Sequence, residues 1–237
     1  MTPEEARARL LYRDGLILVL DKPAGVAVHR GPKGGSSLED DFDTLRFGLP
    51  RKPALAHRLD RETAGCLVLG RHHKALEKLG LLFKQGKITK SYWAIVAGSP
   101  DEESGAIDLA LGRLDDTRGW WMKVDPKGLP ARTLWRVKGR GVWRGAPIAW
   151  LELEPQTGRT HQLRVHCATQ GWPILGDAIY GERADVPLQL LARKVVVPLM
   201  QGKPPIEVEA RAPSHMLETL AACGFVGEPA REPVGSL

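Results

Sequence analysis

The feature that most limits the fold is a succession of short strand-like segments separated by turns and not by helices. Runs of β-branched, aliphatic and aromatic residues recur along the chain, and Gly, Pro or Asp lies between several of them. Because strands and helices do not alternate strictly, the pattern predicts an α+β fold with a mostly antiparallel sheet. The expected strands are Leu16–Leu20, Cys66–Leu69, Tyr92–Val96, Trp120–Val124, Thr133–Val137, Ile148–Leu153, Val195–Leu199 and Ile206–Val208.

Helix signals are fewer, and each combines an apolar face with a cap or a stop. Ser37 precedes one apolar face, with Asp40 in the capping-box position, and apolar side chains after Ala75 recur at helical spacing. A glycine follows each expected helix and ends it. These helices run from Ser37 to Gly48, from Ala75 to Gly86, from Thr160 to Gly171 and from Ser214 to Gly224.

The chain of 237 residues is long enough for one or two domains and for a core that needs no disulfide or metal. No internal repeat and no clear linker divides it. The residues from Gly227 onward lack apolar periodicity. We therefore expect a single domain over residues 1–225 and a loose C-terminal tail over residues 226–237.

The balance of charge favours an anionic partner. Lys and Arg number 34 against 28 Asp and Glu, which gives a net charge of +6 and an isoelectric point near 9.3. Such a protein favours nucleic acid first and anionic membranes second, although a basic chain without any such partner has the same composition. The 43% hydrophobic and 26% charged residues exclude a disordered chain, a collagen and a disulfide scaffold.

Several common sites are missing from the sequence. Cys66, Cys167 and Cys223 form no C-x-x-C pair, which argues against a disulfide framework or a zinc ribbon and favours the reducing cytoplasm. No segment has the apolar length of a membrane span, and we expect no secretory signal because the first fifteen residues contain no long apolar run. Motifs for a P-loop, a dinucleotide fold, an H-E-x-x-H zinc site and a G-x-S-x-G serine are absent. We therefore expect neither a cofactor nor a metal.

One polar cluster places a carboxylate between arginines just ahead of an apolar strand. It reads H-R-L-D-R-E-T-A-G over residues 57–65. Nearby guanidinium groups are expected to keep Asp60 ionised, and a poorly solvated carboxylate can act as a nucleophile or a base. The alternative is a structural aspartate that caps a turn toward Thr63 and Gly65.

A second cluster, residues 156–166, opens an expected helix, and helix N-termini bind anions. Arg159 and Arg164 add charge that phosphates or a carboxylate can use, although an exposed basic helix start explains the same residues. Tyr92, at a strand start, can stack on a base or pack in the core. Trp120 and Trp121 have the same two interpretations, and alternation along the expected strand turns at least one of them inward.

Taken together, these stretches resemble the RluA-type pseudouridine synthases over about residues 14–210. Long blocks match in order and spacing, which makes the resemblance far more specific than any short motif. The blocks are D-K-P-A-G at 21–25, H-R-L-D-R-E-T-A-G at 57–65, K-S-Y-W-A at 90–94, P-A-R-T at 130–133, T-G-R-T-H-Q-L-R-V-H at 157–166 and G-W-P-I-L-G-D-A-I-Y-G at 171–181.

The resemblance implies an α+β fold with a mixed, mostly antiparallel central sheet in two halves, flanking helices and a basic central cleft. It also implies that uridine in RNA becomes pseudouridine through base flipping, without a cofactor or metal. The implied partner is a stem-loop of ribosomal or transfer RNA, with no membrane and no required protein partner.

The same resemblance implies roles for particular residues. Asp60 resembles the catalytic aspartate, and Arg164 resembles the arginine paired with it. Tyr92 resembles the tyrosine stacked on the uracil, and Arg58 the residue that enters the RNA stack. Whether Asp60 attacks the sugar, attacks the base or abstracts a sugar proton stays open. The expected further substrate contacts are His57, Arg61, Arg159, Thr160, His161, Gln162 and Leu163.

The sequence departs from the family pattern in several places. An S4 RNA-binding domain often precedes the catalytic domain, and we expect none here because the match begins near residue 14. Ala64 replaces the usual serine of a T-S-G triplet, and Ala192 ends a segment, residues 190–192, that lacks the usual L-H-A histidine. Two other hypotheses remain, an RNA-binding module with a degenerate site and a base-removing glycosidase that pairs Asp60 with Glu62.

Overall fold

The computed structural model describes residues 3–31, 34–115, 117, 120–182 and 185–229. The chain forms two compact units, and each is described by itself. Unit 1 consists of Met1–Thr89, Ala192–Arg211 and Glu228–Leu237, and unit 2 of Lys90–Leu191 and Ala212–Gly227. Because unit 1 is assembled from separated stretches, no single cut divides the chain into these units.

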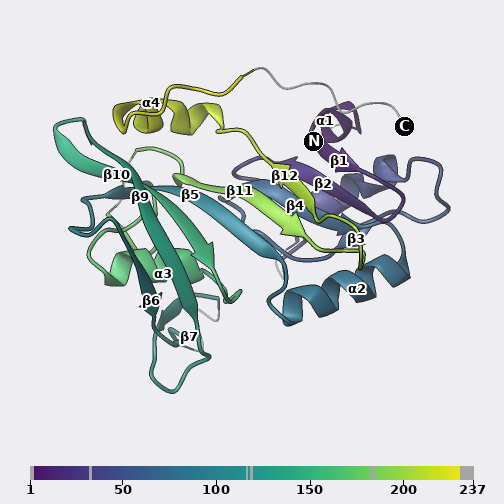
Figure 1. Cartoon of the computed structure of the whole chain (residues 1–237), viewed down its shortest axis with the longest axis horizontal. Coiled ribbons are helices and arrows are strands. Elements are labelled where there is room, and N and C mark those ends of the chain that lie inside the picture. The colour runs from purple at the N-terminus through teal and green to yellow at the C-terminus, as the bar shows by residue number, and fades with distance from the viewer. Residues whose placement is uncertain (1–2, 32–33, 116, 118–119, 183–184, 230–237) are drawn as a thin grey trace. The chain divides into compact units, whose positions relative to one another are not determined.

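Unit 1 is built on a sheet in the order β1-β2-β4-β11, with β3 paired to β4 and β12 paired to β11 (Figure 1). The pairings of β1 with β2, β2 with β4, β3 with β4 and β11 with β12 are antiparallel. Its elements are α1 (Pro3–Ala8), β1 (Leu10–Arg13), β2 (Ile17–Lys22), the 3₁₀ helix η1 (Leu38–Leu45), β3 (Ala54–Leu55), β4 (Ala64–Gly70), α2 (His73–Lys84), most of β11 (Leu190–Val197) and β12 (Ile206–Glu209).

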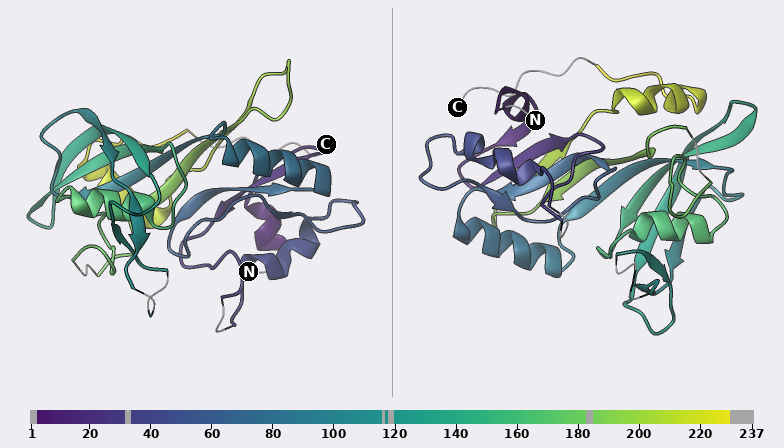
Figure 2. Two further views of the ribbon diagram at one scale, coloured as in Figure 1. Left: turned by 90° about the horizontal axis from the view of Figure 1, so that it is seen from below. Right: turned by 180° about the vertical axis from the view of Figure 1, so that it is seen from behind.

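Helices cover both faces of this sheet, with α2 on one side and α1 and η1 on the other (Figure 2). Every residue of the apolar strand β4 is therefore buried. Gly70 ends that strand where a Cβ atom would lie 2.6 Å from Leu76 Cγ, so only glycine allows α2 to start so close to the strand. This central strand follows directly on the loop that carries Asp60.

Unit 2 contains an antiparallel sheet in the order β5-β10-β9-β6 and a separate hairpin of β7 and β8. Strands β9 and β10 are joined by Arg144 and Gly145, which both have positive φ, as a tight hairpin turn requires. The elements are β5 (Thr89–Ala97), β6 (Ser104–Asp108), β7 (Leu111–Arg113), β8 (Met122–Val124), β9 (Arg132–Trp143), β10 (Ala146–Pro155), α3 (Gln162–Thr169) and α4 (Ser214–Ala222).

The two faces of this sheet are covered differently. Alternate residues of β10, among them Leu151 and Leu153, pack in one buried cluster with Leu163 and Cys167 of α3. On β9, a Cβ atom at Gly139 would lie 1.9 Å from the backbone oxygen that follows α4, so glycine is required for this close approach. The buried side of α3 thus fixes the helix that carries Arg164.

The structure confirms the α+β class, the mostly antiparallel strands and all the expected helical regions. Residues 38–45 form a 3₁₀ helix, in which Asp40 accepts a hydrogen bond from the Ser37 N–H at 2.8 Å. The expected cap Thr160 lies outside α3, whose N-cap is His161. The expected strand Trp120–Val124 shortens to β8, so neither tryptophan lies on a strand.

Some elements lacked a recognisable pattern in the sequence. The short elements α1, β1, β3, β6 and β7 were not expected. The single domain over residues 1–225 stays a prediction. Of the expected loose tail, residues 230–237 lie outside the described residues. Glu228, which belongs to the same tail, forms ion pairs with Arg193 at 2.6 Å and with Arg211 at 3.4 Å.

Candidate active site

Asp60 lies half-buried in the loop between β3 and β4. Its backbone oxygen accepts a hydrogen bond from the Thr63 N–H at 3.1 Å, and the adjacent Leu59 and Thr63 are buried. This backbone hydrogen bond closes the turn that was the structural alternative for this residue. A carboxylate held on such a short, anchored turn can serve as a nucleophile or as a base.

The buried side chain of Lys22, which was not among the expected site residues, holds this loop in place through a hydrogen bond to its backbone. It is 0% exposed, and its Nζ donates to the backbone oxygens of Pro23, Val26 and Arg61 at 2.8–2.9 Å. Burial lowers the pKa of Lys22 to about 8, against the opposing effect of the negative charges of Glu62 and Asp60. The signal in the sequence was a lysine at the end of a strand that begins with four apolar residues.

The residues before Asp60 divide into an anchored and an exposed one. His57 Nε2 accepts a hydrogen bond from the Val68 N–H at 3.0 Å, and its ring lies 4.7 Å from that of Phe83. Arg58 is exposed, and its Nη1 lies 3.1 Å from His29 Nε2. His57 thus fixes the loop on β4, while Arg58 projects from it.

The arginine and the acid that follow Asp60 lie on the surface. Arg61 Nε donates to the Gly25 oxygen at 2.9 Å, and Arg61 lies 3.6 Å from Glu62. The side chain of Glu62 is half-exposed. A glycosidase needs two carboxylates in one enclosed site, and the exposure of Glu62 argues against that hypothesis.

In unit 2, Arg164 forms a buried ion pair with an acid that the sequence analysis did not single out. Its Nε and Nη2 donate to the two carboxylate oxygens of Asp177 at 2.8 and 2.7 Å. The exposed fractions of the two side chains are only 6% and 1%. This planar, two-bond geometry fixes the guanidinium in position, as Arg–carboxylate pairs do.

Asp177 belongs to the G-D-A-I-Y stretch, to which the sequence analysis assigned no chemistry. Burial alone would raise its pKa, but the hydrogen bonds and charge of Arg164 outweigh it and hold the pKa below its usual value. The N–H groups of Ile179 and Tyr180 also donate to Asp177 Oδ1, at 2.9 and 3.1 Å. An aspartate that can bond the backbone two residues ahead was the available signal.

His161 joins this ion pair to a tyrosine. Arg164 Nη1 lies 3.4 Å from His161 Nε2, and His161 Nδ1 lies 2.8 Å from the Tyr180 hydroxyl. Because a guanidinium can only donate, a hydrogen bond between these two groups has His161 Nε2 as its acceptor. The backbone of His161 has a left-handed φ of 51°, which turns the chain into α3.

Two other expected residues near the start of α3, Gln162 and Arg159, form hydrogen bonds to neighbouring residues of the protein. Gln162 Oε1 accepts from the Arg159 N–H and the Thr157 hydroxyl, and Gln162 Nε2 donates to Arg132 and Thr133. Arg159 Nε donates to the Pro130 oxygen at 3.0 Å. These bonds hold the loop ahead of α3 on strand β9.

Tyr92, Leu163 and Thr160 complete the expected residues of unit 2. Tyr92 lies on β5, opposite Leu153 of β10, and packs half-buried against the core. Leu163 is buried in the same cluster, whereas Thr160 is exposed. The structure therefore groups Asp60 with Arg58 and Arg61 on one loop of unit 1, and Arg164 with His161 at the start of α3 in unit 2.

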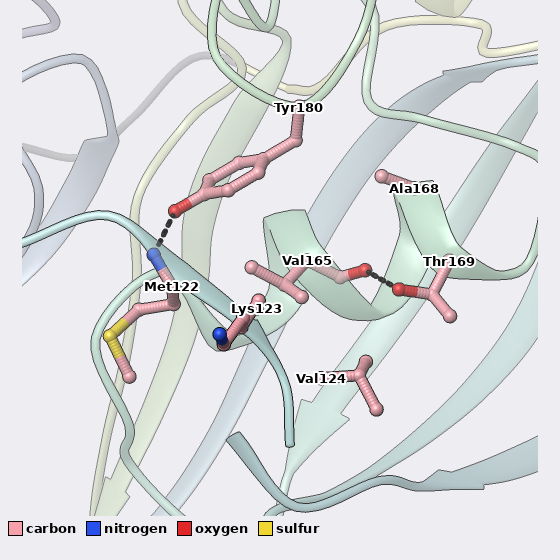
Figure 3. A pocket seen from close by; sticks show the side chains of 7 residues that line it. All are labelled: Met122, Lys123, Val124, Val165, Ala168, Thr169 and Tyr180. Atoms are coloured by element: carbon pink, nitrogen blue, oxygen red, sulfur yellow. Dashed lines mark hydrogen bonds between the residues drawn. The ribbon is translucent and has the colours of Figure 1, made fainter. Parts of the chain in front are cut away.

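A hollow of about 300 Å³ lies in unit 2 between β8, α3 and Tyr180 (Figure 3). None of the expected catalytic residues lines it. The lining residues are Met122, Lys123, Val124, Val165, Ala168, Thr169 and Tyr180.

Among the described residues, no three His, Cys, Asp or Glu side chains are grouped closely enough to hold a metal ion. In the same part of the chain, no helix is long and apolar enough to cross a membrane.

Comparison with known proteins points to one family. A family model described as RNA pseudouridylate synthase matches residues 16–169, a span that contains Asp60, Tyr92 and Arg164. An uncharacterised RNA pseudouridine synthase from Zymomonas mobilis is 40% identical over 210 residues, which cover 86% of this chain and 94% of that protein. Ribosomal large subunit pseudouridine synthase C from Vibrio cholerae is 36% identical, over 73% of this chain and 53% of its own.

The chain spans nearly all of the Zymomonas protein but only 51–61% of the next curated relatives. Among solved structures, human RNA pseudouridylate synthase domain containing 4 superimposes with a TM-score of 0.78 at 25% identity. That match covers 93% of this chain and 95% of the human one. This match confirms the α+β fold with a mixed, mostly antiparallel sheet that the resemblance implied.

Proposed function

Because the chain belongs to the RNA pseudouridine synthase family, whose members are isomerases, we propose that it converts specific uridines of structured RNA to pseudouridine. The observation that carries the proposal is Asp60, held half-buried on a turn that Lys22 fastens from below. In the reaction the C1′–N1 bond breaks, a C1′–C5 bond forms, N1 gains a proton and C5 loses one to water.

Asp60 is the residue to which we assign the glycosidic step. A carboxylate can attack C1′, attack the ring or remove a sugar proton, and each route uses its negative charge. Tyr92 is assigned to the face of the uracil, where a phenol can stack and take part in removing the C5 proton. Arg164 is assigned to orient the aspartate, and its rigid pairing with Asp177 supports a positioning role.

Arg58 is assigned to the RNA stack. A base inside a helix or tight loop has to flip out before its glycosidic bond can be reached, at a cost of a few kcal/mol. Arg58 is exposed on the loop of Asp60 and is long enough to occupy the vacated place. Arg61 and Arg159 add positive charge for phosphates.

The RNA class is proposed from the chemistry and from one relative. The net charge of +6 favours a polyanion, and the Vibrio protein is named for the large ribosomal subunit. Ribosomal RNA is therefore our first candidate, and transfer RNA the second. We place the reaction in the cytoplasm, because all three cysteines are buried free thiols, which suits a reducing compartment.

The test uses loss of the C5 hydrogen as a direct readout. Unmodified large-subunit ribosomal RNA and transfer RNAs, transcribed with tritium at uridine C5, are incubated with the protein and with Asp60→Asn. We expect wild-type protein to release tritium to water from at least one of these RNAs and Asp60→Asn to be slower by several orders of magnitude.

Glu62→Gln is the matched control. It also removes one negative charge, but from a half-exposed side chain two residues after Asp60. We expect it to keep its rate and to bind RNA as tightly as Asp60→Asn does. Release of tritium by folded Asp60→Asn at the wild-type rate would move the catalytic role elsewhere. Absence of release from all RNAs by the wild-type protein would refute the proposed activity on them.

A further inference from the structure

An exposed tryptophan marks the surface of unit 2 beside α3. The side chain of Trp120, in the segment that leads into β8, is 58% exposed. In the same unit Trp93, Trp135, Trp150 and Trp172 are all buried. An exposed indole keeps a large apolar face in water, and such a side chain gains most when a flat partner covers it.

Trp120 lies beside the residues that surround Arg164. Its ring centroid is 5.5 Å from that of His161 and 5.7 Å from that of Trp121, both edge to face. His161 Nε2 in turn lies 3.4 Å from Arg164 Nη1. A single side chain, His161, thus contacts both the exposed indole and the guanidinium that we assign to the reaction.

Hydrogen bonds fix the chain on the C-terminal side of the exposed ring. The Leu114 N–H donates to the Trp121 oxygen at 2.7 Å. The Met122 N–H donates to the Tyr180 hydroxyl at 2.8 Å (Figure 3). Because these neighbours are already ordered, a partner that stacks on Trp120 loses little affinity to ordering this backbone.

The charged side chains of the adjoining strands β7 and β8 are cationic. Arg113 ends β7, Lys123 lies on β8, and both are exposed. Cations on the hairpin that Trp120 leads into suit a nucleotide, whose base can stack on the indole while its phosphate is attracted by the positive charge. An apolar protein segment matches these cations less well.

We propose that Trp120 is a base-stacking residue that holds an unpaired nucleobase of the RNA close to the target uridine. The inference rests on the proposed function and adds a contact that selects for an unpaired neighbour of the uridine. Stacking is sequence-tolerant because every base has a π face, so Trp120 selects the local RNA structure more than the identity of the base.

The experiment measures RNA affinity in the Asp60→Asn background, in which the RNA is not consumed. The probe is the RNA from which wild-type protein releases tritium, cut to the stem-loop around the target uridine. Trp120→Ala is expected to raise Kd about 5- to 150-fold, the range for loss of one stacked base. Trp120→Phe is expected to restore most of the affinity, and Trp120→Leu much less, since leucine is apolar but not aromatic.

Trp143→Ala serves as the control, because this tryptophan lies on the β9–β10 hairpin with Arg144 stacked 4.1 Å from its ring. We expect its Kd to stay within about twofold of the parent value. A second arm replaces single nucleotides beside the uridine with abasic residues. At the position whose base stacks on Trp120, the abasic RNA should bind the Trp120→Ala protein as tightly as it binds the Asp60→Asn parent. A merely structural role of Trp120 would not produce this coupling between one nucleotide and one side chain.

The outcomes separate this inference from the proposed function. Unchanged affinity of folded Trp120→Ala for an RNA that the wild-type protein modifies overturns the stacking role alone. A penalty that persists at every abasic position also overturns it. If wild-type protein modifies none of the RNAs, the proposed function fails and the stacking role fails with it.

Discussion

Replacing Asp177 by asparagine tests whether the buried pair with Arg164 has the energetic and functional weight that its geometry indicates. Asparagine keeps an oxygen for the N–H groups of Ile179 and Tyr180, but it removes the negative charge and replaces the acceptor of the Arg164 Nε–H by a donor. The pair is 1–6% exposed, so water cannot replace the lost acceptor easily. Removing one partner of such a buried pair typically costs about 3–5 kcal/mol.

That cost is large against the roughly 5–15 kcal/mol by which folded proteins are stable. Urea unfolding at neutral pH measures it, and Glu103→Gln provides the comparison. Glu103 is paired with Arg140 in the same unit at 2.6 Å, but its side chain is 75% exposed. Breaking that surface pair should cost only about 0–1 kcal/mol. Equal, small losses for Asp177→Asn and Glu103→Gln would refute the reasoning.

A double variant separates stability from activity. Replacing both partners of a buried pair by apolar side chains of similar volume is often neutral or stabilising. We therefore expect Arg164→Met with Asp177→Leu to recover part of the lost stability, limited by the two N–H groups that lose their acceptor. Tritium release should stay lost, because Arg164 is absent. Recovery of activity together with stability would show that Arg164 has only a structural role.

The remaining predictions concern unit 1. Arg58→Ala should slow single-turnover conversion of a stem-loop uridine more than it weakens RNA binding. The control is Arg30→Ala, which removes an exposed cation paired with Asp40 and should change neither rate nor affinity by more than about twofold. An equal loss of rate and affinity in Arg58→Ala would make Arg58 a phosphate contact only. Lys22 has a pKa of about 8 when folded and 10.5 as its ordinary value, so between these values the unfolded chain binds more protons and stability rises with pH. Relative to Lys22→Met, the free energy of unfolding of wild-type protein should therefore increase by up to about 1.4 kcal/mol per pH unit between about pH 8 and 10.5. A pH-independent difference would contradict the buried position of Lys22.

Local chemistry explains which parts of the fold could be predicted. The apolar run that became β4 and the glycines that follow α2 and α4 are signals within a few neighbouring residues, and the structure follows them. The expected cap Ser214 is instead the first residue of α4, and Pro213 is its N-cap. The edge strands β1 and β6 were missed because edge positions are half-exposed and need no apolar alternation. The tryptophans ahead of β8 were placed on a strand because their alternation fits one. The strand begins only at Met122, whose N–H donates to the hydroxyl of Tyr180, a residue far away in sequence.

The sequence by itself determined the α+β class, the blocks that carry Asp60, Tyr92 and Arg164, and the positive charge that favours RNA. These depend on composition and on neighbours along the chain. Only the tertiary structure identified Asp177 as the partner of Arg164 and Lys22 as the support beneath Asp60, and only it left Trp120 exposed beside His161. Each of these depends on burial and on contacts between residues that are distant in sequence, because a carboxylate or an ammonium acquires its role from the groups that replace water around it.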